Sequence, residues 1–150
     1  MDTTDGFRIA FTVSDKKRFM HLLLIGDESE LMIDRYLDDG SLYVGFIDDV
    51  PVAVCVAVVI DAGVVEIKNL AVMSRYRCKG YGRRILQYVE SRYPGKTIIL
   101  GTGETPSTLR FYKSCGYSYS HRIPDFFTDN YPAPIVEEGI QLRDMIYLKK

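Results

Sequence analysis

The chain has 150 residues, of which 47% are hydrophobic and 26% charged, and this predicts a single globular domain over residues 1–150. Its formal net charge of −1 gives no general attraction to nucleic acid or to an anionic membrane, so we expect neither as a partner. No apolar run approaches the roughly 20 residues of a membrane helix, and Asp2 and Asp5 stand where a secretory signal would be positive, so we expect a cytoplasmic protein.

The first half of the chain predicts a strand, two helices and then an antiparallel meander. Alternating apolar and polar residues indicate a half-buried strand, and apolar residues at helical spacing follow it. After the Asp39-Gly40 break, valine-rich runs separated by short turns indicate three further strands. The expected strands are 7–13, 41–47, 51–60 and 64–72, and the expected helices are 14–26, capped by Ser14, and about 28–37.

The second half predicts helix, strand, helix and a closing strand. Apolar residues at helical spacing follow Gly82 until Pro94-Gly95, and a further helix should run from Pro106 to Gly116. Between them the run 97–100 predicts a buried strand, parallel to the earlier strand 64–72 because a helix crosses between the two. A connection with three prolines leads to a last strand over about 141–148. The expected fold class is α/β, with a mostly antiparallel sheet, one parallel crossover and flanking helices.

The run Arg77-Cys78-Lys79-Gly80-Tyr81-Gly82 lies between a predicted strand and an amphipathic helix, where a phosphate-binding turn must lie. Backbone N–H groups at a helix N-terminus bind a diphosphate, and the helix dipole favours its charge. Gly80 and Gly82 have no side chains that would hold the phosphate away, while Arg77 and Lys79 add cationic donors. Neither the third glycine of a dinucleotide-binding turn nor the P-loop pattern is present.

Three segments resemble the GNAT acetyltransferase superfamily in their order and spacing: Glu66–Val72, Arg77–Gly82 and Phe111–Tyr117. The resemblance implies an acyl-CoA N-acyltransferase fold that uses acetyl-CoA as cosubstrate and no metal. It also implies that the backbone of Leu70, Ala71 and Val72 pairs with the pantetheine arm, that residues 77–82 wrap the pyrophosphate, and that the sheet splays beside the strand 64–72.

Tyr112 is the candidate general acid. A thioester is already activated, so transfer requires a neutral amine beside its carbonyl, donors for the oxyanion and a proton for the leaving thiolate. A backbone N–H near Val72 could serve the oxyanion. Tyr112 belongs to the motif F-Y-x-x-x-G-Y, residues 111–117. The resemblance implies that it occupies the position of the tyrosine that protonates the thiolate in this family. The alternative is that Tyr112 only packs beside Phe111 on its helix.

Glu66 is the candidate general base, acting through a water, because the resemblance places it at the position of a catalytic glutamate in some family members. The alternative is a solvated strand residue or one that is ion-paired with Lys68. Strand alternation predicts one orientation for Glu66, Lys68 and Leu70, opposite to that of Ile67 and Asn69.

Thr105 stands where the family often has an asparagine that contacts the cofactor or a water, and its hydroxyl is the candidate for that contact. The three cysteines, Cys55, Cys78 and Cys115, lack C-x-x-C spacing, so neither a disulfide framework nor a zinc site is predicted. Core packing is favoured for Cys115 over an acyl-cysteine role.

The segment 124–138 combines aromatic residues, prolines and carboxylates. Such a segment could recognise a cationic amine, or it could cover the sheet or form a dimer contact. The expected activity is acetyl transfer to a primary amine of a small molecule, by direct attack in a ternary complex. The alternatives are a protein lysine or N-terminal amine as acceptor, and a noncatalytic coenzyme A sensor. A homodimer would fit the resemblance and the frequency of C2 dimers.

Overall fold

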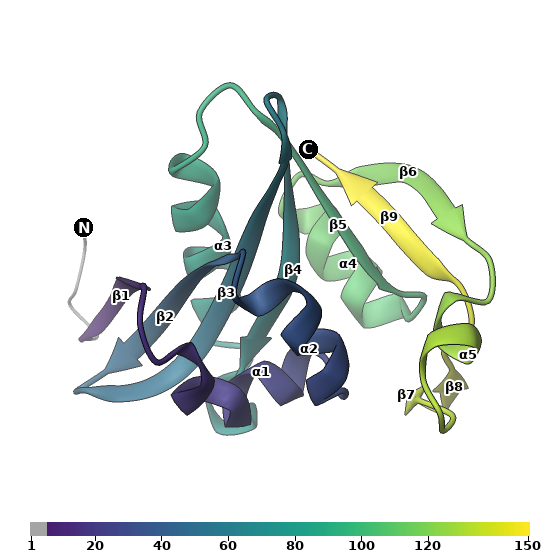
Figure 1. Cartoon of the computed structure of the whole chain (residues 1–150), viewed down its shortest axis with the longest axis horizontal. Coiled ribbons are helices and arrows are strands. Elements are labelled where there is room, and N and C mark those ends of the chain that lie inside the picture. The colour runs from purple at the N-terminus through teal and green to yellow at the C-terminus, as the bar shows by residue number, and fades with distance from the viewer. Residues whose placement is uncertain (1–5) are drawn as a thin grey trace. The chain divides into compact units, whose positions relative to one another are not determined.

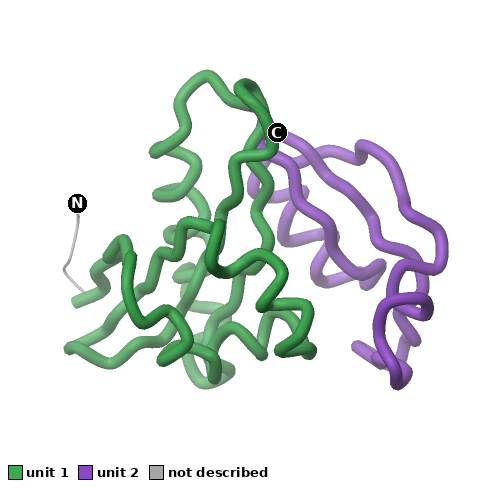
Figure 2. The backbone as a smooth tube through the Cα atoms, viewed as in Figure 1, with its two compact units in different colours: residues 1–96 green, residues 97–150 purple. Residues whose placement is uncertain are grey.

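The computed structural model describes residues 6–150, which separate after Lys96 into an N-terminal unit and a C-terminal unit that begins at Thr97 (Figure 2). The prediction of one domain over the whole chain stays a prediction. Within residues 6–150, no helix is both long and apolar enough to cross a membrane.

An antiparallel meander forms the sheet of the N-terminal unit (Figure 1). Its strands are β1 (Phe7–Thr12), β2 (Ser41–Ile47), β3 (Val50–Asp61) and β4 (Val64–Val72). The turn between β2 and β3 consists of Asp48 and Asp49, which both have positive φ (47° and 68°), as a tight hairpin turn requires. The predicted strand order of this half is therefore confirmed.

Helices cover both faces of this sheet (Figure 1). They are the 3-10 turn η1 (Lys16–Phe19), α1 (Met20–Gly26), α2 (Glu30–Leu37) and α3 (Tyr81–Ser91). Leu22, Leu23 and Ile33 pack with strand residues such as Val54 in one buried cluster, and Tyr88 of α3 contacts the opposite face. The cap predicted at Ser14 is wrong, because the chain turns instead through Asp15 in the left-handed region (φ 50°), which aspartate tolerates.

β4 contains a β-bulge at Lys68. Ile67 and Asn69 pair with two consecutive residues of β3, so Lys68 is an extra residue between them. Because side chains alternate along a strand with a period of two, one extra residue moves Asn69 to the face that carries Glu66. The prediction that Glu66 and Leu70 share a face, opposite to Asn69, is therefore wrong.

The sheet of the C-terminal unit has β9 at its centre, antiparallel to both of its neighbours β5 and β6 (Figure 1). Its elements are β5 (Thr97–Gly103), α4 (Pro106–Ser114), β6 (Ser118–Ile123), α5 (Phe126–Asn130), the hairpin β7 (Val136–Glu137) and β8 (Ile140–Gln141), and β9 (Met145–Lys149). The last strand begins later than predicted because Leu142 is buried ahead of it and donates its N–H to the carbonyl of Ile135 at 2.8 Å.

The helix α4 ends at a glycine, as predicted. Gly116 has φ 97°, and the N–H of Tyr117 reaches back to the carbonyl of Tyr112 at 3.0 Å. This hydrogen bond between residues i and i+5 is typical of a Schellman motif. It gives a partner to the carbonyl of Tyr112, which lies in the last turn of the helix, where carbonyl groups lack the regular intrahelical donor. The glycine turn directs Tyr117 into the core, where it is only 3% exposed.

Candidate functional site

After β4 the chain passes through the 3-10 helix η2 (Ser74–Tyr76), and residues 77–82 then lead into α3 through left-handed backbone. Cys78 has φ 60° and Gly80, the residue that precedes α3, has φ 89°. No side chain of the described residues caps this helix, and a Cβ added at Gly80 would have none of their atoms within 4 Å. The space in front of the helix N-terminus is therefore open, as a bound diphosphate requires.

The groups around this turn suit an anion. The backbone N–H groups of Tyr81 and Gly82 lie in the first turn of α3, where no intrahelical carbonyl can accept them. Arg77 and Lys79 are exposed, and Arg77 Nε donates to the carbonyl of Val72 at 3.1 Å, which draws its side chain back toward the end of β4. The residues present thus fit the predicted pyrophosphate.

The side chains of Cys78 and Tyr81 differ in their surroundings. Cys78 is exposed in the turn, whereas Tyr81 as a whole is 9% exposed and its ring lies 4.7 Å from that of Phe7, centroid to centroid. The Tyr81 ring therefore packs in the core, which leaves the backbone of Tyr81 as its part of the predicted site.

The backbone N–H and C=O groups of successive residues in β4 point alternately to the two edges of the strand. The N–H of Met73 donates to the carbonyl of Val52 in β3 at 2.8 Å. Since polar backbone groups alternate along an antiparallel strand, Leu70 and Val72 direct theirs away from β3, and Ala71 directs its groups toward β3. Of the three residues predicted to pair with pantetheine, Leu70 and Val72 fit that role, while Ala71 contributes its buried methyl group to the core.

Glu66 is buried in β4, on the face that α1 and α2 cover. Its carboxylate pairs with Lys68 Nζ at 3.2 Å, and the residue as a whole is 7% exposed. The ion pair named as the alternative to catalysis is thus present. The role of Glu66 as a base stays a prediction.

Tyr112 and Thr105 belong to the C-terminal unit, whereas the other predicted site residues belong to the N-terminal unit. The Tyr112 ring lies in the last turn of α4 and contacts those of Phe111 and Tyr117, with centroids 5.1 and 5.9 Å away. Thr105 precedes α4 and is 1% exposed. Its hydroxyl lies near the Glu138 carboxylate without the geometry of a hydrogen bond, so it retains capacity for another partner.

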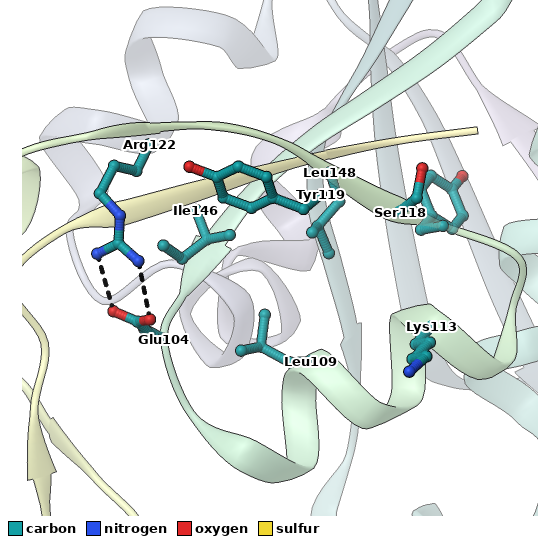
Figure 3. A pocket seen from close by; sticks show the side chains of 9 residues that line it. Glu104, Leu109, Lys113, Ser118, Tyr119, Arg122, Ile146 and Leu148 are labelled. Carbon is teal, nitrogen blue, oxygen red and sulfur yellow. Dashed lines mark hydrogen bonds and ion pairs between the residues drawn. The ribbon is translucent and has the colours of Figure 1, made fainter.

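A cavity of about 370 Å³, which the sequence did not predict, lies between α4, β6 and β9 in the C-terminal unit (Figure 3). Its apolar lining includes Leu109 and Ile146, and at its rim Arg122 makes two hydrogen bonds to Glu104 at 3.0 and 3.1 Å. A second carboxylate, that of Asp144, lies 2.6 Å from Arg122, and these hydrogen bonds raise the pKa of the guanidinium. None of the predicted site residues lines this cavity.

A family model described as the acetyltransferase (GNAT) family matches residues 8–117. The chain belongs to the GNAT acetyltransferase family. Among curated relatives, the uncharacterized N-acetyltransferase YvbK of Bacillus subtilis (strain 168) is 35% identical over an alignment of 131 residues, and the match covers 85% of this chain and 84% of YvbK. Membership of the GNAT family makes this protein an acyltransferase.

Solved structures of GNAT proteins match nearly the whole chain. An acetyltransferase from Elizabethkingia anophelis, with acetyl-CoA bound, has a TM-score of 0.91 and 32% identity over 97% of this chain and 98% of that one. A Bacillus subtilis acetyltransferase in complex with CoA has a TM-score of 0.86 and 33% identity over 95% and 97% of the two chains. The fold class predicted from the sequence is confirmed.

Proposed function

We propose that this GNAT acetyltransferase transfers an acetyl group to a primary amine of a small molecule, by direct attack in a ternary complex. The acyl donor is acetyl-CoA, which supplies an activated thioester when bound. The observation that carries the acceptor class is the cluster of the aromatic rings of Phe126, Phe127 and Tyr131 at α5, in a segment that also has exposed carboxylates.

The donor would be held by groups that the fold already exposes. The outward backbone groups of Leu70 and Val72 would pair with the pantetheine arm, and the N-terminus of α3, with Arg77 and Lys79, would bind the diphosphate. The buried Thr105 hydroxyl offers a further polar contact. A backbone N–H of β4 near Val72 would stabilise the oxyanion.

Two side chains would move protons in this proposal. Tyr112 would donate its phenolic proton to the departing thiolate, a base of similar pKa. Its ring contacts with Phe111 and Tyr117 would hold the phenol in place. Glu66 would accept a proton from the acceptor amine through a water, with Lys68 orienting the carboxylate.

The segment 124–138 supports a cationic acceptor. The ring of Phe127 lies 5.3 Å from that of Phe126 and 5.8 Å from that of Tyr131, centroid to centroid, and all three side chains are half-buried. The exposed carboxylate of Asp129 belongs to the same short helix. Aromatic faces beside a carboxylate attract ammonium groups. Ile135 of the same segment is buried, so the segment also covers part of its own unit.

The test is turnover of acetyl-CoA, followed as release of the CoA thiol, with spermidine, free lysine, kanamycin, and peptides bearing a lysine or a free N-terminal alanine. We expect turnover with at least one small amine and none with the peptides. Turnover with peptides alone would contradict the small-molecule acceptor. Binding of CoA without turnover of any acceptor would favour the sensor.

Paired variants would connect the acceptor to α5. Asp129→Asn should raise the KM of the active amine about tenfold and leave the KM of acetyl-CoA unchanged. Asp39→Asn, an exposed carboxylate in the N-terminal unit, is the matched control. Equal behaviour of the two variants would remove α5 from acceptor recognition.

A further inference from the structure

Asn69 ties the two helices α1 and α2 to β4. Its Nδ2 donates to the carbonyl of Leu23 at 2.9 Å and to the hydroxyl of Tyr36 at 3.1 Å. Leu23 lies in the last turn of α1, and its carbonyl also accepts the backbone N–H of Asp27 at 3.0 Å, so the strand residue Asn69 adds a second hydrogen bond at the end of this helix. The Tyr36 hydroxyl in turn donates to Asp27 Oδ2 at 3.3 Å, which extends the network to the connection between the helices.

Gly26, the last residue of α1, packs directly against β4. A Cβ at this position would lie 2.2 Å from Asn69 Oδ1 and 3.3 Å from the carbonyl oxygen of Leu70. Asn69 Oδ1 is buried and has no hydrogen-bond partner among residues 6–150, and it lies so close to Gly26 that a Cβ there would overlap it. A larger residue at position 26 would therefore require the Asn69 carboxamide to shift and would crowd the Leu70 oxygen.

The bulge at Lys68 creates this arrangement. Without the extra residue, Asn69 would face α3, and with it the carboxamide faces the end of α1. The next residue along the chain is Leu70, whose backbone groups point away from β3. The side chain that is fixed by α1 and α2 is therefore one peptide bond from the backbone group expected to meet pantetheine.

We propose that Asn69 and Gly26 are positioning residues that fix the Leu70 carbonyl at the edge of β4 for the pantetheine arm of acetyl-CoA. The proposal rests on the donor site described under the proposed function. It assigns the end of α1 a part in donor binding, although no atom of α1 belongs to the phosphate-binding turn. The carboxamide acts through the strand, and the glycine allows the close approach.

The proposal predicts local changes in amide hydrogen exchange on binding of CoA. In the unaltered protein, CoA should protect the amides of residues 70–72 and those of residues 77–82. Asn69→Asp keeps the shape of the side chain and removes both N–H donors, so CoA protection at 70–72 should fall about tenfold, while protection at 77–82 at saturating CoA remains. Gly26→Ala, which pushes against the same two oxygens, should act in the same way.

Tyr93→Phe is the matched control, because it removes a tyrosine hydroxyl that lies 3.4 Å from the Tyr43 hydroxyl and is outside this network. It should leave both protected segments unchanged. Unchanged protection at 70–72 in Asn69→Asp would overturn the proposal. So would loss of protection at both segments together, which would mean that Asn69 supports the N-terminal unit as a whole. Absence of CoA protection in the unaltered protein would instead refute the donor site.

Discussion

The Glu138 carboxylate accepts a hydrogen bond from the hydroxyl of Ser107, 31 residues earlier in the chain. Glu138 and Gly139 form the turn of the β7–β8 hairpin, with φ values of 53° and 74°, and Ser107 lies in the first turn of α4. The residue before α4, Thr105, makes no capping hydrogen bond to the helix. The hairpin thus supplies negative charge to the N-terminus of the helix that carries Tyr112.

This contact predicts a loss of stability in acid. The Ser107 hydroxyl is the main cause that lowers the pKa of Glu138 below its ordinary value. A carboxyl whose pKa is lower in the folded state stabilises the protein above its unfolded pKa, and this contribution disappears as the pH falls through the folded pKa. Glu138→Gln should therefore reduce the drop in melting temperature between about pH 6 and about pH 3, by roughly 1–3 °C.

Calorimetry at a series of pH values would measure the effect of Glu138→Gln. Asp129→Asn, from the same segment but outside this hydrogen bond, is the control variant and should keep the slope of the unaltered protein. Identical pH profiles for Glu138→Gln and the unaltered protein would show that the carboxylate adds nothing to stability.

Gly80→Glu should abolish CoA binding. The new side chain would place a carboxylate in front of the α3 N-terminus, so the Kd measured by titration calorimetry should rise at least about 100-fold. Gly95→Glu is a matched control, because Gly95 also has positive φ (76°) and no described atom within 4 Å of an added Cβ. Both changes cost similar backbone strain, of about 1–2 kcal/mol. Equal CoA affinity in the two variants would place the diphosphate elsewhere.

Tyr112→Phe should lower kcat about 100-fold, because the phenylalanine keeps the ring contacts and removes only the proton donor. The KM of acetyl-CoA should change little. Steady-state assays with the acceptor found by the screen provide the measurement, and Tyr119→Phe, an exposed tyrosine, is the control. An unchanged kcat would leave Tyr112 the packing role beside Phe111.

Of the three thiols, Cys78 alone should react quickly with iodoacetamide in the native protein. Cys78 is exposed, whereas Cys55 and Cys115 are buried, and burial raises the pKa of the Cys55 thiol. Since Cys78 lies in the turn that we propose binds the diphosphate, acetyl-CoA at about ten times its Kd should slow alkylation roughly tenfold. Mass spectrometry would locate the modified residue. Rapid modification of Cys55 would contradict the packing of β3.

The regular elements of the fold could be predicted where local pattern and packing agree. The range of β4, Val64–Val72, is the one predicted, because a tight turn precedes a run that is rich in β-branched residues. The bulge at Lys68 was missed, since it depends on the register with β3 and leaves no mark in β4 alone. The helix α5 and the β7–β8 hairpin were missed for a similar reason: they are short and depend on distant contacts such as that between Glu138 and Ser107.

The residues of the candidate site were predicted from motifs together with the family resemblance. The motif does not distinguish backbone from side chain, however, and so it could not show that the Tyr81 ring packs in the core. Asn69 was not singled out, although an asparagine within an apolar strand is a sign of a buried polar group that needs partners. The single domain, the homodimer and the cytoplasmic location stay predictions.

The bulge at Lys68 also changes how this strand is to be altered by design. Counting every second residue, the usual way to choose one face of a strand, fails when the count passes Lys68. A library aimed at the face that meets α1 and α2 must change from even to odd positions at this residue. The residues of that face include Glu66, Asn69 and Ala71.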